Sequence, residues 1–93
     1  MNATDMAVKV KEAQSKLITP WIEDTLFNKF VHSTDNVARI SYKDKPKQDM
    51  WVEYLEELGY DVHEYRCDGD KMWAVSYQRE SIASFIREKD DGR

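Results

Sequence analysis

The apolar and polar positions predict that the first third of the chain is helical. Apolar side chains recur every three or four residues from residue 5 to residue 18, as on one face of a helix, and Thr4 precedes them as an N-cap. The rhythm resumes after Pro20 and continues to Val31. Proline removes a helical hydrogen bond and clashes with the preceding turn. We therefore expect either two helices, with Thr19 capping the second, or one helix kinked at Thr19.

The middle of the chain predicts a strand followed by a helix. Residues 37–42 alternate between apolar and polar types, which is typical of a half-buried strand with Tyr42 on its inward face. A charged loop follows, and we expect Pro46 to open a helix that runs to Leu58. Gly59 then supplies the left-handed residue at which this helix ends.

The stretch from residue 60 to residue 77 predicts a β-hairpin around Asp68-Gly69. A two-residue hairpin turn needs left-handed residues, and this pair provides them. A two-residue turn places Val62 opposite Val75, whereas a three-residue turn with a bulge would alter this register. The face that we expect to point toward the core carries Tyr60, Val62, Trp73, Val75 and Tyr77, and the outer face carries Asp61, His63, Tyr65, Cys67, Met72, Ala74 and Ser76.

The last apolar positions predict a short helix with Ile82, Phe85 and Ile86 inward, and residues 88–93 form a frayed tail. The order of elements is helix, helix, strand, helix, strand, strand, helix. This order predicts a single α+β domain over residues 1–93, with a small three-stranded, mainly antiparallel sheet and helices packed on one face.

Composition adds an expectation about partners. The chain has 93 residues, which is the size of one domain, and its three Trp and five Tyr are more than so small a core can hide. We therefore expect some aromatic surface to meet a partner protein or a second copy of the chain in a homodimer. The net charge of −4, with both signs mixed along the chain, argues against direct binding of nucleic acid, which usually requires a basic face.

Sequence features also bear on the compartment. No apolar run approaches the roughly 20 residues of a membrane helix, so we expect no membrane partner. The first ten residues lack the charged start and apolar block of a secretory signal. The single cysteine, Cys67, excludes an internal disulfide and suits a reducing compartment. We expect a cytoplasmic protein.

Residues with potential chemistry form no convincing site. His63 and Cys67 share a strand face, but they are roughly 13 Å apart along an extended chain, too far to share one zinc ion. Asp68-Gly69-Asp70 resembles the start of a calcium loop but lacks the later ligands, and His32 is placed to cap a helix end. The sequence also contains no glycine-rich phosphate loop, no GxSxG and no HExxH motif. We therefore expect that the protein is not an enzyme and that it binds neither a cofactor nor a metal ion.

Two surfaces are candidates for binding a partner. The first is an acidic stripe on the helix after Pro46, whose carboxylates are roughly 5–6 Å apart, close to the spacing of backbone phosphates. It either imitates nucleic acid or is the solvated face of an amphipathic helix. The second is the outer face of the hairpin. The acidic stripe comprises Asp49, Glu53, Glu56 and Glu57, and the hairpin candidates are His63, Tyr65 and Met72.

The passage from helix to hairpin resembles small accessory proteins of tailed bacteriophages over roughly residues 20–77. The matching residues are Tyr54, Leu55, Gly59, Tyr60 and Val62, followed by Trp73 and Val75. The resemblance implies a small non-enzymatic binding protein that acts in the cytoplasm of a host bacterium. Such a protein occupies a host or viral macromolecule and modulates or inhibits it, in host takeover or anti-defence. The alternative is a minor structural or assembly protein of the virion.

Overall fold

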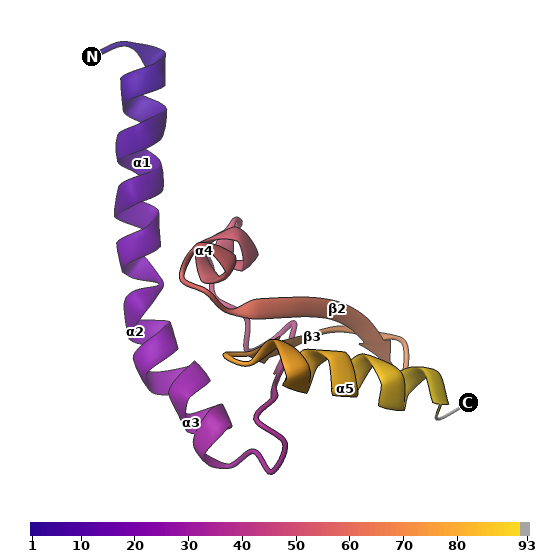
Figure 1. Cartoon of the computed structure of the whole chain (residues 1–93). Coiled ribbons are helices and arrows are strands. Elements are labelled where there is room, and N and C mark those ends of the chain that lie inside the picture. Colours follow the sequence, from indigo (N-terminus) through magenta and orange to yellow (C-terminus); the bar gives the residue numbers. More distant parts are fainter. Residues whose placement is uncertain (92–93) are drawn as a thin grey trace.

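The computed structural model describes residues 1–91 and has an antiparallel three-stranded sheet with helices around it (Figure 1). The strands are β1 (Ala38–Ser41), β2 (Asp61–Cys67) and β3 (Asp70–Ser76), in the spatial order β1-β3-β2. β3 is central and pairs antiparallel with both neighbours. The predicted α+β class and three-stranded sheet are confirmed.

A long helical arm forms the N-terminal third and bends beside the sheet (Figure 1). The first helix is interrupted at Ile18, and helical structure resumes one residue before Pro20, whose missing N–H cannot continue the ladder of the first helix. The upper part of the arm extends away from the rest of the molecule (Figure 1). Along the chain the arm consists of α1 (Ala3–Leu17), α2 (Thr19–Trp21), the π-helix η1 (Ile22–Leu26) and α3 (Phe27–Val31).

The start of α1 corrects one prediction. The N-cap is Asn2, whose side-chain Oδ1 accepts a hydrogen bond from the Asp5 amide at 2.9 Å, so the prediction of Thr4 was wrong. Asparagine is at least as good an N-cap as threonine, and choosing it adds residues to the helix. Thr19 likewise does not cap the second segment, because Ile18 holds that position without a side-chain hydrogen bond.

Helix α4 (Trp51–Glu57) is shorter than predicted at its start and ends where predicted. Pro46 is buried in the preceding loop and does not open the helix. At the other end Gly59 has a φ of +98°, and its amide bonds the Glu56 carbonyl at 3.0 Å. The Tyr60 amide bonds the Leu55 carbonyl, also at 3.0 Å. These two bonds are the Schellman pattern, which satisfies the last helical carbonyls.

The hairpin has the predicted turn and register. Asp68 and Gly69 both have positive φ, of 54° and 84°, as a two-residue type I′ turn requires. Val62 lies opposite Val75, as predicted.

The sheet separates two apolar layers. The helical arm and α4 cover one face, and α5 (Arg79–Asp91) covers the other. We expected all helices on one face, and α5 departs from that expectation because the arm and α4 already occupy that face. The buried residues of the first layer are Ile18, Leu26, Ala38, Ile40, Trp51, Tyr54, Leu55, Trp73 and Val75, and those of the second are Val37, Ala74, Ile82 and Phe85.

Helix α5 is longer than predicted. Ile82 and Phe85 are buried and Ile86 is half-buried, which agrees with the predicted inward face. The helix continues to Asp91, so residues 88–91 of the predicted tail are helical. The last two residues of that tail, 92 and 93, lie outside the described residues.

Candidate interaction surface

A groove of about 380 Å³ opens on the surface where the helical arm meets the start of the hairpin. Its walls are almost entirely apolar, and one carboxylate, that of Glu23, stands at its edge. This volume lies within the range of about 300–1,000 Å³ that is usual for ligand pockets. The residues that line the groove are Ile22, Glu23, Leu26, Phe27, Phe30 and Tyr60.

The π-helix η1 explains how residues of the helical arm come to line the groove. The inward residues of the arm, Ile18, Ile22, Leu26 and Phe30, recur every four positions. On a regular helix of 3.6 residues per turn, such a series drifts around the axis. The Phe27 amide bonds the Ile22 carbonyl across a wider i→i+5 turn, which absorbs part of the drift. Leu26 and Phe30 therefore both reach the core layer.

Because Leu26 and Phe30 face the core, the apolar residue that follows each of them points outward. Phe27 follows the buried Leu26 and is therefore rotated by about 100° away from the core. Its side chain is 64% exposed, and Val31, one turn later on the same face, is 59% exposed. Both residues belong to the apolar rhythm that predicts a helix from Pro20 to Val31. Their signal was present in the sequence, since adjacent apolar pairs at 26–27 and 30–31 are too wide for one inward stripe.

Aromatic rings form the wall of the groove beside Phe27. The rings of Phe30 and Tyr60 are nearly parallel, at 8°, with centroids 6.4 Å apart. Tyr77 meets Phe30 edge-on at 5.0 Å, and its hydroxyl donates to Asn36 Oδ1 at 2.9 Å. Tyr77 was predicted to be a core residue, but it is 51% exposed because it lies just beyond β3, at the rim of the sheet. The wall is thus held by stacking and is open to solvent.

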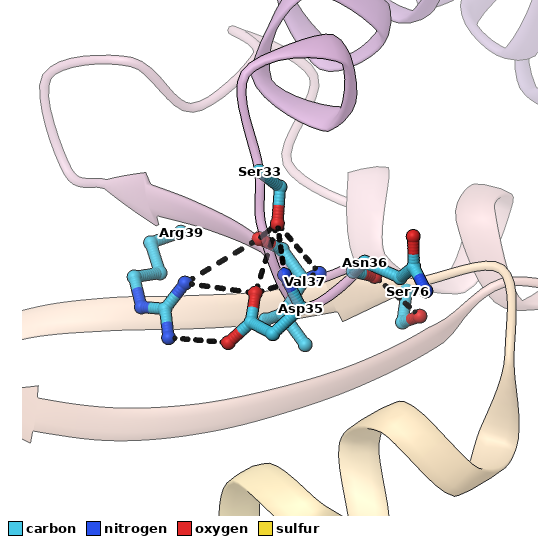
Figure 2. Close-up of polar contacts among 6 residues, drawn as sticks. All are labelled: Ser33, Asp35, Asn36, Val37, Arg39 and Ser76. Atoms are coloured by element: carbon cyan, nitrogen blue, oxygen red, sulfur yellow. Dashed lines mark hydrogen bonds and ion pairs between the residues drawn. The ribbon is translucent and has the colours of Figure 1, made fainter.

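The connector between α3 and β1 fixes the arm against the sheet through a polar network (Figure 2). Ser33 Oγ lies 2.8 Å from Asp35 Oδ1 and accepts from the Val37 amide at 3.1 Å. Arg39 Nη2 donates to Asp35 Oδ2 at 2.9 Å. The hydrogen bond from Arg39 lowers the pKa of Asp35 to about 2. Serine and carboxylate are both engaged in shaping this loop, so we assign the cluster a structural role.

A second contact of the connector reaches the central strand. The buried Ser76 hydroxyl donates to the Asn36 carbonyl at 2.7 Å (Figure 2). The same hydroxyl accepts from the Gln78 amide at 3.1 Å. Asn36 has a φ of 60°, a left-handed conformation that asparagine tolerates better than most residues. The connector therefore sets the position of α3 and of Tyr77, and with them the geometry of the groove.

The acidic stripe is exposed, and one of its carboxylates, that of Glu57, is paired with a lysine. Glu53, Glu56 and Glu57 project from α4, whereas Asp49 lies in the turn before the helix, outside the predicted spacing. Lys11 of α1 donates to Glu57 Oε1 at 2.9 Å, and this hydrogen bond raises the pKa of Lys11. Part of the negative charge is thereby neutralised by the arm.

The outer hairpin face is a second core layer and is less open than expected. His63, Tyr65 and Met72 do share one face, since Tyr65 lies opposite Met72 and two residues from His63. All three are half-buried. The Tyr65 ring packs edge-on against Phe85 of α5 at 5.0 Å, and burial raises the pKa of Tyr65. The prediction that alternation sends this face outward overlooked α5.

Other potential sites add little. Within residues 1–91, His, Cys, Asp and Glu side chains form no group of three that could hold a metal ion. His32 caps the end of α3, as predicted, and Cys67 is a free, half-buried thiol. No helix in the described part of the chain is both long and apolar enough to cross a membrane.

Comparisons with known proteins return nothing similar. No family model, no curated protein and no solved structure matches the chain.

Proposed function

We propose that the chain is a small non-enzymatic binding protein whose groove accepts an apolar side chain or a short apolar helix from a partner protein. The observation that carries this proposal is the exposure of Phe27 at the rim of a preformed groove walled by other aromatic rings. Aromatic anchors that fill such pockets dominate the energetics of protein interfaces. Glu23 at the rim favours a basic residue beside the apolar anchor of the partner.

The proposed partner is a host macromolecule, which the protein occupies and thereby modulates or inhibits. Support for a bacterial host comes from the resemblance of the helix-to-hairpin passage to phage accessory proteins. The acidic stripe is a second candidate surface for the same function, through imitation of nucleic acid. The groove has the stronger support because the arm pairs with Glu57 of that stripe.

Phe27→Ser tests the groove, and Tyr42→Ser is its matched control. Both side chains are aromatic and highly exposed, at 64% and 66%, so neither change should lower the melting temperature appreciably. Tyr42 lies beyond β1 and does not line the groove. Each protein, with the unmodified chain alongside, is immobilised and exposed to bacterial lysate, and the affinity for any stoichiometric partner is then measured.

The unmodified chain and Tyr42→Ser should retain the same partner, and Phe27→Ser should weaken its binding at least about tenfold, or about 1.4 kcal/mol. Equal affinity for all three proteins would exclude the groove. A fourth protein, with Glu53, Glu56 and Glu57 changed to Gln, separates the two surfaces. If it loses binding while Phe27→Ser keeps it, the acidic stripe is the contact surface. Failure of the unmodified chain to retain any partner would count against the proposal as a whole.

A role in virion assembly is the second candidate function, and the exposed apolar side chains of α1 favour it. No side chain of α1, whose residues are all described, is buried, and its apolar Met6, Val10 and Leu17 are exposed. An assembly component should bind a shell protein in fixed stoichiometry through α1. An inhibitor should bind one host protein and be indifferent to Val10→Ser.

A further inference from the structure

Strand β2 has seven residues and lies at one edge of the sheet. It pairs with β3 along its whole length and with no other strand of the described chain. It contains no proline. Natural proteins usually blunt such edges with proline, charged side chains, bulges or a covering element, because the unpaired backbone groups invite another strand. This edge is independent of the groove and of the function proposed for it.

The hairpin register identifies which backbone groups face outward. Cys67 and Asp70 flank the two-residue turn and form the pair that exchanges both hydrogen bonds. Hydrogen-bonded and non-bonded pairs then alternate along β2. The N–H and C=O groups of Val62, Glu64 and Arg66 consequently point away from β3. Within residues 1–91, no segment outside the sheet makes a backbone hydrogen bond to β2.

The neighbouring helices leave the second half of this edge accessible. On one face, α5 contacts both β3 and β2, and its Phe85 ring also reaches the Arg39 guanidinium of β1, with 5.3 Å between the guanidinium carbon and the ring centroid. It therefore lies over β3 and β2, and no backbone hydrogen bond among the described residues joins it to β2. On the other face, α4 leads directly into the first residues of β2 through Gly59. The stretch from His63 to Cys67 lies beyond that junction.

We propose that a second copy of the chain pairs with this edge, antiparallel, so that Glu64 of each copy lies opposite Arg66 of the other. Each such pair exchanges both backbone hydrogen bonds and brings opposite charges together. The two Tyr65 residues then face each other at the two-fold axis, and the two sheets join into one.

Charge selects this register over its neighbour. Sliding the copies by one step, to place Glu64 opposite Glu64, would oppose like charges at the centre. The contacts that Glu64 and Arg66 make within one chain do not prevent pairing. Glu64 lies 3.4 Å from Lys71 Nζ and is 56% exposed, and Arg66 donates to the Gly69 carbonyl at 3.3 Å. Exposed pairs of this kind contribute little to stability, so they can rearrange when the edge is paired.

Amide hydrogen exchange of the unmodified chain tests the pairing directly. Between about 20 µM and about 1 mM protein, the Glu64 and Arg66 amides should exchange at least about tenfold more slowly as the dimer forms. The Val62 amide, which this register leaves unpaired, should not change. The Tyr65 amide should stay protected throughout, because its bond to β3 lies within one chain. Equal exchange of Glu64 and Arg66 at both concentrations would overturn the proposal.

Variants separate this edge from any other dimer surface in sedimentation experiments. Glu64→Pro removes an outward N–H without touching the ladder to β3, and it should leave the protein monomeric with its hairpin intact. Glu64→Arg should weaken the dimer, and combining it with Arg66→Glu should restore it, because the opposite charges then face each other again. A dimer that persists in Glu64→Pro, or a charge exchange that fails to restore it, would also overturn the proposal.

Discussion

Asp35 is the centre of the connector network, and neutralising it should cost stability in a manner that depends on pH. Asp35→Asn keeps an oxygen that can accept from Ser33 and from the Val37 amide, so the shape of the loop is preserved. What it removes is the negative charge that faces Arg39 across 2.9 Å. The substitution thus isolates the electrostatic part of the network.

The lowered pKa sets an upper bound on this contribution. The pKa of Asp35 falls from its ordinary 3.8 to about 2, which at about 1.4 kcal/mol per pH unit corresponds to about 2 kcal/mol. The Asp35 side chain is 39% exposed, so solvent screens the pair, and we expect about 1 kcal/mol. Because the folded-state pKa is depressed, this stability is present above about pH 4 and is lost as the pH falls through about 2. Only part of it should remain at pH 3, below the ordinary pKa of the group.

Urea denaturation at pH 7 and at pH 3 measures the effect. Asp35→Asn should lower the free energy of unfolding by about 1 kcal/mol at pH 7 and by clearly less at pH 3. Asp49→Asn is the control, because Asp49 is exposed and outside the network, and it should change little at either pH. A loss for Asp35→Asn that is equal at both pH values would refute the reasoning, since it would trace the effect to a disturbed loop instead of to ionisation.

Two further predictions concern the helix that leads into the hairpin. Gly59→Ala should lower the free energy of unfolding by about 1–2 kcal/mol through its φ of +98° alone, since an added Cβ has no described atom within 4 Å outside Gly59 and its two chain neighbours; a variant as stable as the unmodified chain in urea would contradict this. Leu55→Ala should cost about 3 kcal/mol because Leu55 is fully buried, whereas Leu58→Ala, at 62% exposure, should cost less than about 0.5 kcal/mol. Thermal melts of the two leucine variants check the contrast, and similar losses would show that the two sides of α4 are assigned incorrectly.

The hairpin and the end of α4 were predictable from sequence because their causes are local. Gly59 and the Asp68-Gly69 pair are the residues that tolerate positive φ, and each sits where the chain needs that conformation. Once the turn type is set, the register follows from it, so Val62 lies opposite Val75 in the structure as it did in the prediction. Such features involve residues only a few positions apart.

The start of α4 shows where local signals compete. Pro46 is compatible with the first turn of a helix, and it is equally compatible with a loop. In the structure the loop is tied to the arm, because Trp21 Nε1 donates to the Asp44 carbonyl at 2.8 Å and Lys29 Nζ lies 3.4 Å from Asp44. The loop that contains Pro46 is thus in contact with the arm, and α4 begins only at Trp51. Asp49 therefore lies before the helix that carries the other acidic residues.

The sequence by itself determined the order of helices and strands and the register of the hairpin. Tertiary structure decided which surface each element meets. α5 carries an apolar stripe that fits either face of the sheet, and it lies over Tyr65 because the other face is already covered by the arm and α4. The exposure of Phe27 likewise depends on a π-turn and on where the arm crosses the sheet. An apolar pattern records that a side chain prefers to leave water, but only the packing of distant elements determines whether room remains for it.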